Sequence, residues 1–292
     1  MRVMVLGGTG TVGSQVAREL LARGAEVFVL TRGTAGKQPP AGAKVVQGDL
    51  LEPATARTAF DGMDGLFLIN AVSTTEAHEG LMAVCGAREA GVGRIAYLSV
   101  HAVDQAAYLP HFGAKIGVEA AVATSGIAYT ILRPNNFYQN DYWYKDAMLQ
   151  YGVYPQPVGE AGLSRVDVRD IAEAATIALT SGAHDGETYN VVGPEAVTGS
   201  STAATWSAAL GRQVGYAGDD LERWEEQNLR YLPAYMVYDF KLMYAHFQRH
   251  GLRATAEDVA RVTRLLGHPP RRFADFARET AAAWGVAAGA PA

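Results

Sequence analysis

The stretch Val3–Leu20, VMVLGGTGTVGSQVAREL, decides the fold class of this chain. A short apolar run leads into glycines at positions 7, 10 and 13, and an amphipathic helical pattern follows. At such a strand-to-helix turn the glycines permit the tight turn, a close approach of the backbone to a pyrophosphate, and close packing of helix on strand. The helix N-terminus faces the anion with unpaired N–H groups. The stretch predicts a dinucleotide-binding loop, whose candidate contacts are Gly7, Thr9, Gly10, Thr11, Val12 and Gly13.

Short apolar segments alternate with helical patterns through the first half of the chain. The segments EVFVLTR, AKVVQGD, GLFLIN, RIAYLSV and AYTILRP lack polar alternation, which indicates strands buried on both faces. Such strands, separated by helices, predict an α/β fold with a Rossmann-type, doubly wound parallel sheet. Beyond residue 144 the pattern is less regular, although VDVRDIAEAATIAL predicts a further helix and ETYNVVG a further strand.

The later part of the chain predicts a second, smaller lobe. We expect a dinucleotide domain over residues 1–150, to which 164–192 return, and a lobe over 151–163 and 193–292. This lobe is mostly helical and aromatic, and its segment TAEDVARVTRLLG opens with Thr255 and Asp258 at capping-box spacing. We interpret it as the part that closes over a substrate.

Composition excludes several classes of function. The net charge of −5 argues against a nucleic-acid surface, which needs a basic face. No apolar run approaches the roughly 18 residues that span a bilayer, and the apolar start of the chain is too short for a signal sequence. The single cysteine, Cys85, excludes an internal disulfide and fits a reducing compartment. We expect a cytoplasmic protein that binds neither membrane nor nucleic acid, acts on a small molecule and could form a homodimer.

The end of the second predicted strand distinguishes between the two nicotinamide dinucleotides. An NAD site carries Asp or Glu there, about 20 residues after the loop, to hold the ribose 2′-hydroxyl. This chain has Thr31 and Arg32 instead, with Lys37 close enough in sequence to help. A guanidinium can bind a 2′-phosphate with two parallel hydrogen bonds. NADPH is therefore favoured over NADH, and a solvated surface arginine is the alternative for Arg32.

Further candidates lie where other predicted strands end, because ligands of this architecture bind outside the carboxyl edge of the sheet. Asp49 and Leu50 follow the third strand, where the adenine edge would lie, and Asn70 ends the fourth strand over the cofactor. His246 and His250 have the spacing of a metal-binding helix, but the pattern lacks the expected glutamate and a third ligand. We therefore predict no metal site.

The motifs as a set resemble the NmrA-like group of atypical short-chain dehydrogenases/reductases. They are GGTGTVG, LTR, GDL, the segment HFGAK…VEAAVATSGIAYTILRPNNF, and VDVRDIAEAA, and the resemblance covers roughly the first 190 residues well. It implies a Rossmann fold, NADP(H) binding and a substrate cleft between two lobes. Relatives of this group include isoflavone reductase-like enzymes, quinone reductases and NADPH-sensing regulators. The resemblance also implies that Pro134, Asn135 and Phe137 wall off the nicotinamide.

The catalytic residues that the resemblance implies are altered in this chain. Ordinary members of the superfamily have a serine at the end of the fifth strand and a Tyr-x-x-x-Lys pair on the next helix. Here Ser99, His111 and Lys115 occupy these positions, and residues four apart share one helix face. Imidazole titrates near neutrality and could donate a proton, as could Tyr108 or water, and His101 could also reach the site. A packed histidine and a solvated helix lysine are the alternatives.

Aromatic residues follow the sixth predicted strand. Tyr138, Tyr142, Trp143 and Tyr144 supply flat, amphipathic surface, which suits a planar substrate such as a quinone, an enone or an imine. Together with Tyr108, the first three are our candidates for substrate contact. The alternative, that they pack the second lobe, is equally open.

Two functions are compatible with these sequence features. The first is an NADPH-dependent oxidoreductase that reduces a small, planar carbonyl, quinone, enone or imine by hydride transfer. The second is a redox sensor that binds NADP(H) and acts through a protein partner without chemistry, which the histidine at position 111 motivates. The retained Lys115 and the well-developed second lobe favour the enzyme.

Overall fold

A parallel sheet lies at the centre of the first half of the molecule. The computed structural model describes residues 1–33 and 38–285, and within them a seven-stranded sheet has the order β3-β2-β1-β4-β5-β6-β8. Every neighbouring pair is parallel. The strands are β1 (Arg2–Val5), β2 (Glu26–Thr31), β3 (Lys44–Gln47), β4 (Gly65–Leu68), β5 (Arg94–Leu98), β6 (Ala128–Pro134) and β8 (Glu187–Val191). The predicted doubly wound sheet is confirmed.

The order of the strands reverses between β1 and β4, because the chain runs outward to β3 and then crosses back. In open α/β sheets this reversal leaves a crevice at the carboxyl ends of the strands, where ligands bind. The glycine loop follows β1, and Asn70 comes just after β4. The topology therefore brings two of the predicted cofactor segments to neighbouring strand ends.

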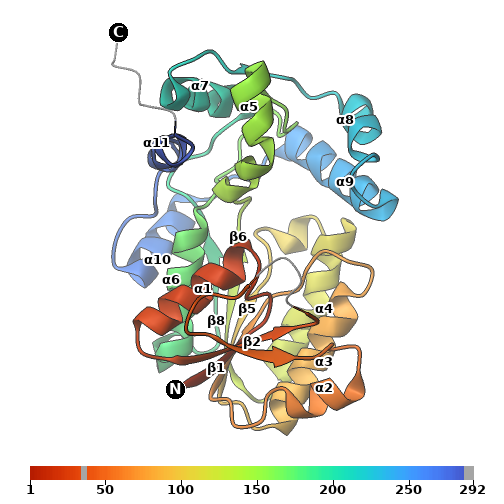
Figure 1. Cartoon of the computed structure of the whole chain (residues 1–292), viewed down its shortest axis with the longest axis vertical. Helices are drawn as coiled ribbons and strands as arrows, with labels where there is room; N and C mark the ends of the chain where they lie inside the picture. Colours follow the sequence, from red (N-terminus) through yellow and green to blue (C-terminus); the bar gives the residue numbers. More distant parts are fainter. Residues whose placement is uncertain (34–37, 286–292) are drawn as a thin grey trace. The chain divides into compact units, whose positions relative to one another are not determined.

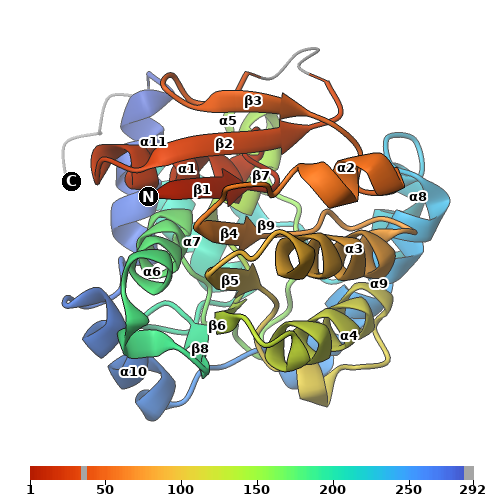
Figure 2. The ribbon, with the colours of Figure 1, turned by 90° about the horizontal axis from the view of Figure 1, so that it is seen from below.

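Helices cover both faces of this sheet. Figure 2 shows α6 (Val168–Thr180) on one side and α2 (Pro53–Thr58), α3 (Glu76–Glu89) and α4 (Pro110–Thr124) on the other. Helix α1 (Thr11–Ala22) packs on α6. The hydrophobic core between the sheet and α2–α4 includes Leu66, Tyr97 and Val118. Two 3₁₀ turns, η1 (Val103–Gln105) and η3 (Gly182–His184), join the elements.

One burial prediction is wrong. The segment AKVVQGD forms β3, but its side chains are largely exposed, and Val45 is 46% exposed. The reason is its place at the edge of the sheet, next to β2 alone. An edge strand with two apolar and two polar residues can remain exposed to solvent and does not require helices packed on both of its faces.

The described residues divide into two compact units. The first contains the described residues of 1–134 and 168–191, and the second contains those of 135–167 and 192–285. Residues 135–150, 164–167 and 192, which the sequence pattern groups with the dinucleotide domain, lie in the second unit. The assignment of cofactor and substrate roles to the two parts stays a prediction.

The second unit is mostly helical. Its helices are η2 (Tyr138–Tyr144), α5 (Lys145–Tyr151), α7 (Gly199–Leu210), α8 (Leu221–Asn228), α9 (Ala234–His250), α10 (Ala256–Leu266) and α11 (Phe273–Ala283). Strands β7 (Val153–Tyr154) and β9 (Gly215–Tyr216) pair in parallel. Figure 1 shows α7 beside α11, where the rings of Trp206 and Trp284 stack 5.1 Å apart. The predicted capping box is confirmed, since Thr255 Oγ1 accepts a hydrogen bond from Asp258 N.

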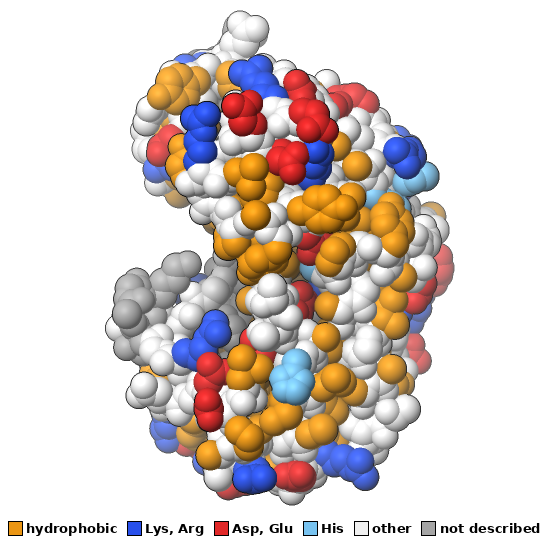
Figure 3. Space-filling model, turned by 90° about the vertical axis from the view of Figure 1, so that its right-hand side faces the viewer, with side chains coloured by type: hydrophobic (Ala, Val, Ile, Leu, Met, Phe, Trp, Pro, Cys, Tyr) orange, Lys and Arg blue, Asp and Glu red, His pale blue; other side chains and the backbone are white. Residues whose placement is uncertain are grey.

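Surface properties agree with an ordinary mixed-charge protein. On the face drawn in Figure 3, basic and acidic side chains lie interspersed rather than in one field of a single sign. Among the helices of residues 1–33 and 38–285, none has the length and apolar character needed to cross a bilayer.

Candidate active site

The glycine loop has the geometry that a phosphate group requires. Gly7 has φ +60°, a conformation that side chains disfavour, and its carbonyl oxygen accepts a 2.8 Å hydrogen bond from Gly10 N. A Cβ atom on Gly13 would lie 2.3 Å from Gly7 O, so only glycine lets α1 approach the loop this closely. Thr9 is half-buried, Thr11 exposed and Val12 buried.

The N-terminus of α1 is left open toward an anion. Its N-cap, Gly10, has no side chain that could cap the helix, and the first turn carries no acidic residue in the described structure. The first N–H groups of a helix otherwise lack partners and carry partial positive charge. Together with the close backbone approach at Gly13, this arrangement fits the pyrophosphate of a dinucleotide.

The residues after β2 and β3 shape two turns. The Thr31 hydroxyl donates to Gly33 O at 2.7 Å and accepts from Gly33 N at 3.2 Å, and Arg32 stands exposed between them. Asp49 Oδ1 accepts from Leu51 N at 3.0 Å, while Leu50 packs in the hydrophobic core. Lys37, the predicted helper of Arg32, lies outside the described residues.

Two buried polar atoms at the strand ends have no hydrogen-bond partner among the described residues. They are Asn70 Oδ1, just after β4, and Ser99 Oγ, just after β5. Asn70 is 8% exposed and Ser99 is 4% exposed. A buried polar atom without a partner is costly, and native proteins rarely retain one without a reason. A polar ligand at the carboxyl edge of β4 and β5 would satisfy both atoms.

Helix α4 brings His111 and Lys115 to one buried face, as their spacing predicts. Each residue is 8% exposed, so the alternative of a solvated Lys115 is excluded. The Lys115 Nζ atom donates to Glu76 Oε1 of α3 at 2.5 Å. The His111 ring meets the Phe112 ring edge-on, with centroids 4.8 Å apart. Burial of His111 is compatible with both an acid and a packing role.

The loop after β5 holds two more of our candidates. His101 is buried, and its backbone N donates to Pro134 O at the end of β6 at 2.9 Å. Tyr108 is 64% exposed. Ala102 has φ +56°, which makes it the only non-glycine with positive φ among the described residues. Strained backbone of this kind clusters at functional sites, and here it lies next to His101.

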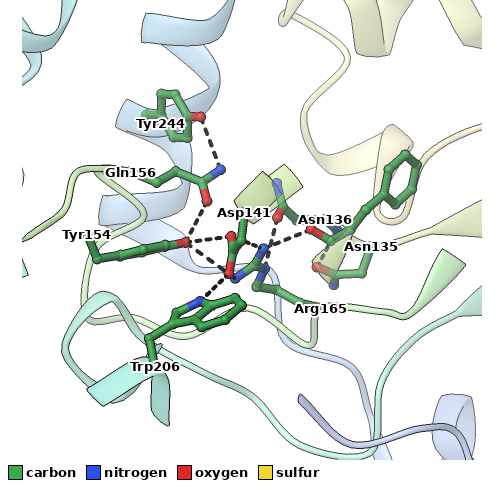
Figure 4. Close-up of polar contacts among 9 residues, drawn as sticks. Asn135, Asn136, Asp141, Tyr154, Gln156, Arg165, Trp206 and Tyr244 are labelled. Carbon is green, nitrogen blue, oxygen red and sulfur yellow. Dashed lines mark hydrogen bonds and ion pairs between the residues drawn. The ribbon is translucent and has the colours of Figure 1, made fainter. Parts of the chain in front are cut away.

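The second unit fixes the segment after β6 through a buried ion pair. Figure 4 shows Arg165 and Asp141 at the centre of a network in which Arg165 Nη2 lies 2.7 Å from Asp141 Oδ1. Arg165 also donates to Asn136 Oδ1 at 3.0 Å and to Phe137 O at 2.8 Å. Asn135 Nδ2 donates to Leu252 O at 2.7 Å. The backbone of residues 135–137 is therefore held in one conformation.

Buried polar groups surround this ion pair. Trp206 Nε1 donates to Asp141 Oδ2 at 2.8 Å, and the Tyr154 hydroxyl lies 3.0 Å from Asp141 Oδ1 and 2.6 Å from Gln156 Oε1. Burial alone would lower the pKa of Arg165, but the charge and hydrogen bond of Asp141 together with the nearby tyrosines Tyr154 and Tyr138 outweigh burial, and the pKa is raised. Burial, reinforced by Asp141, raises the pKa of Tyr154 well above its ordinary value. The Arg165 and Asp141 side chains at its centre are both fully buried.

The aromatic candidates of the second unit separate into two groups. Tyr138 is fully buried between Phe273 and Phe276 of α11, and its hydroxyl donates to Arg271 O at 3.2 Å. Tyr138 therefore packs within the second unit, which was the alternative to substrate contact. Tyr142 and Trp143 are 46% and 71% exposed, which leaves them able to contact a ligand.

Comparison with known proteins identifies the family. The model of the NmrA-like family matches residues 1–269. This chain belongs to the NmrA-like family. It is 33% identical over 290 residues to the NAD(P)H azoreductase of Xenophilus azovorans, an alignment that covers 98% of this chain and 100% of that protein. The predicted family is thus confirmed over most of the chain.

Two further similarities concern named reductases. The chain is 33% identical over 285 residues to the (4-alkanoyl-5-oxo-2,5-dihydrofuran-3-yl)methyl phosphate reductase of Streptomyces griseus subsp. griseus, covering 97% of this chain and 99% of that protein. It also resembles the crystal structure of an NADPH-dependent quinone oxidoreductase from Escherichia coli. That similarity has a TM-score of 0.81 at 25% identity and covers 96% of this chain and 99% of the other.

For this NmrA-like protein, sequence reasoning missed two buried ion pairs. Glu76 pairs with Lys115 across 39 positions, and Asp141 pairs with Arg165 across 24. Glu76 is the first residue of α3. Acidic residues are common at this position because their negative charge interacts favourably with the positive end of the helix dipole. Neither the spacing nor the residue type signals a distant lysine, so no local pattern could have found this pair.

The possible metal ligands of this NmrA-like protein are neighbours on α9. The rings of His246 and His250 have centroids 4.9 Å apart. Within residues 1–33 and 38–285, no group of three or more His, Cys, Asp or Glu side chains is arranged to hold a metal ion. Two neighbouring imidazoles alone do not make a metal centre.

Proposed function

We propose that this protein is an NADPH-dependent reductase of small, planar, conjugated substrates: quinones, carbonyls, enones and compounds with C=N or N=N bonds. The observation that carries the proposal is the polar edge of the sheet. The open N-terminus of α1, the unpartnered atoms of Asn70 and Ser99, and the buried Lys115 ammonium lie at elements that meet at one edge. The reductase class is also that of the named relatives that match nearly the whole chain.

Each part of the cofactor has residues that would hold it. The Gly7–Gly13 loop and the first turn of α1 bind the pyrophosphate through backbone N–H groups. Arg32 binds the 2′-phosphate, and Asp49 and the Leu50 backbone border the adenine. Asn70, Pro134, Asn135 and Phe137 border the nicotinamide end. The bound cofactor supplies the hydride that the reaction needs.

Side chains of the protein donate the proton and orient the reacting atoms. Ser99 and Lys115 donate hydrogen bonds to ligand oxygens at the edge of β4 and β5. His111 or Tyr108 donates the proton that balances the hydride, and water is the remaining source. Tyr142 and Trp143 offer flat, exposed surface against which a planar substrate stacks.

We also propose the substrate class, the cellular location and the assembly of the protein. The substrate is a small molecule, and the reaction takes place in the cytoplasm, as the single cysteine suggests. We expect no nucleic-acid partner, because the net charge of −5 opposes one. A homodimer is the assembly that we would look for first.

A substrate panel tests the proposal. NADPH oxidation would be followed at its absorbance maximum with 1,4-naphthoquinone, an azo dye, a cyclic enone and a cyclic imine, each with and without the protein. We expect turnover with at least one of these compounds and a lower KM for NADPH than for NADH. Complete inactivity across the panel would contradict a reductase.

The same panel separates the enzyme from the redox sensor. A sensor would show no turnover but would bind NADPH and NADP+ with different affinities, which calorimetry measures directly. It would also capture a protein partner in only one of the two cofactor states. Turnover together with similar affinity for the two cofactor forms would remove the sensor from consideration.

A further inference from the structure

The ion pair between Lys115 and Glu76 is almost completely buried. The side chains are 10% and 2% exposed, and Nζ lies 2.5 Å from Oε1. Helices α3 and α4, which carry them, pack against each other. Burial of two charges costs solvation free energy that their attraction often only offsets, and apolar residues in the same places are commonly as stable. A pair of this kind therefore calls for a reason other than stability.

The surroundings of the pair hold Glu76 in a defined place. Gly80, one turn after Glu76 on α3, allows the helix to approach both α4 and the end of β4. A Cβ atom there would lie 2.6 Å from Val118 Cγ2 and 3.0 Å from Asn70 Oδ1. The turn of α3 that follows Glu76 thus lies beside Asn70. The charge of Glu76 also reaches β5, because it helps burial to raise the pKa of Tyr97.

Lys115 has unused donor capacity at this position. An ammonium group has three N–H donors, and within the described residues Lys115 makes one hydrogen bond, to Glu76. Two donors are therefore available to a ligand, and Ser99 Oγ and Asn70 Oδ1 are further buried polar atoms without a partner among the described residues. Without Glu76, the four-carbon stem of the lysine would be free to carry the ammonium elsewhere.

We propose that Glu76 is a positioning residue of this reductase: its carboxylate fixes the Lys115 ammonium at the carboxyl edge of β4 and β5, with two donors aimed at bound ligand. The inference rests on the proposed function. It adds a residue to the site that the sequence motif does not contain. Glu76 acts only through Lys115, which distinguishes it from a residue that touches the reacting atoms itself.

A double-mutant cycle tests this role. The variants are Glu76→Gln, Lys115→Gln and the double variant, and the readouts are the Kd for NADPH, kcat and KM with 1,4-naphthoquinone, and Tm. We expect each single change to lower kcat/KM by about 10- to 100-fold, since a displacement of about 1 Å can cost 100-fold. The double variant should be no slower than Lys115→Gln, because both substitutions remove the same contribution, that of a correctly placed Lys115 ammonium. Its Tm should exceed that of either single variant, in which one buried charge is left alone.

The matched control is Glu119→Gln, which breaks another part-buried ion pair, that of Glu119 on α4 with Arg133 on β6 at 2.6 Å. It should lower Tm while kcat/KM stays within about twofold of wild type. Two outcomes overturn the proposal. In one, Glu76→Gln behaves like this control; in the other, the losses of the two single variants multiply in the double variant.

The experiment still decides the question in two unfavourable cases. If wild type shows no turnover, the proposed function fails, and the positioning role is judged by the Kd for NADPH. A Kd that rises in each single variant and rises no further in the double variant supports the role. A Kd that is unchanged in Glu76→Gln overturns it. If Glu76→Gln does not fold, Glu76→Asp keeps the charge but withdraws the carboxylate by one methylene. It must still lower kcat/KM, and an unchanged value overturns the proposal.

Discussion

Arg32 is exposed just past β2, and we propose that it selects between the two dinucleotides. Its neighbour Thr31 closes a turn with Gly33 through two hydrogen bonds, so the backbone that presents the guanidinium is ordered before any ligand binds. Preorganisation of this kind reduces the entropy lost on binding.

Replacing Arg32 should change the preference for the cofactor rather than the ability to bind one. Hydrogen bonds to a charged group contribute about 1.5–3 kcal/mol each. For Arg32→Ala we therefore expect the Kd for NADPH to rise by about 10- to 100-fold, while the Kd for NADH changes little. Calorimetric titration with both dinucleotides measures this. Arg88→Ala, an exposed arginine at the end of α3, is the control and should leave both affinities unchanged.

Helices α2, α3 and α4 illustrate how element packing positions the site. Glycines on α3 let its neighbours approach closely: Gly80 faces Val118 of α4, and Gly86 faces Ala56 of α2. Because α3 also carries Glu76 and α4 carries Lys115, the separation of these helices sets where the ion pair lies. A change in helix packing is therefore expected to act on the site even when no site residue is altered.

Gly86→Ala tests this packing directly. The added methyl carbon would lie 2.1 Å from Ala56 O and 2.9 Å from the Phe60 ring, so α2 and α3 must separate. We expect a loss of about 1–3 kcal/mol in the free energy of unfolding, measured with urea. Gly117→Ala on α4 is the matched control. No described heavy atom lies within 4 Å of its added carbon, and it should stabilise the protein by about 0.5–1 kcal/mol. Equal effects at the two positions would contradict this account.

Helix α9 contributes a pH dependence of stability. Burial, followed by repulsion from His250 and Arg249, lowers the pKa of His246 below its ordinary value of 6.5. The unfolded chain therefore takes up a proton at higher pH than the folded chain does. The contribution of His246 is fully present above pH 6.5 and is lost as the pH falls from there toward the pKa of the folded state.

His246→Asn should accordingly flatten the dependence of unfolding free energy on pH between pH 7.5 and 5.5, relative to wild type. Urea denaturation at a series of pH values measures the slope. His78→Asn, an exposed histidine on α3, should leave the slope as it is. A slope that stays unchanged in His246→Asn would show that this histidine does not titrate differently on folding.

The whole molecule distributes the candidate groups over two units. The glycine loop, Ser99, His111 and Lys115 belong to the first, whereas Asn135, Phe137, Tyr142 and Trp143 belong to the second. The second unit depends on one buried network, in which segments from η2, β7, α7 and α9 all contribute hydrogen bonds around Asp141 and Arg165 (Figure 4). This network lies in a unit that also buries apolar side chains, among them Phe247, Phe273 and Phe276.

Removing the charge of Asp141 should therefore affect the entire second unit. Asp141→Asn leaves the fully buried Arg165 guanidinium without its counter-charge, and we expect a loss of about 3–5 kcal/mol in unfolding free energy. Thermal and urea denaturation followed by tryptophan fluorescence measure it, since Trp206 contacts Asp141. Asp146→Asn, an exposed residue on α5, is the control and should cost less than about 1 kcal/mol. Comparable losses in the two variants would contradict a central role for the ion pair.

Local spacing along the chain determined most of the fold and the outline of the site. The glycine loop, the strand ends that carry Asn70 and Ser99, and the single helix face of His111 and Lys115 follow from neighbouring residues, because a few turns or strand positions set their geometry. Tertiary structure alone decided which strand lies at the edge, and so why β3 is exposed. It also decided that Tyr138 enters the core and that Lys115 meets Glu76. Such partners come from distant segments, and their contact depends on how whole helices pack, which no short stretch of sequence encodes by itself.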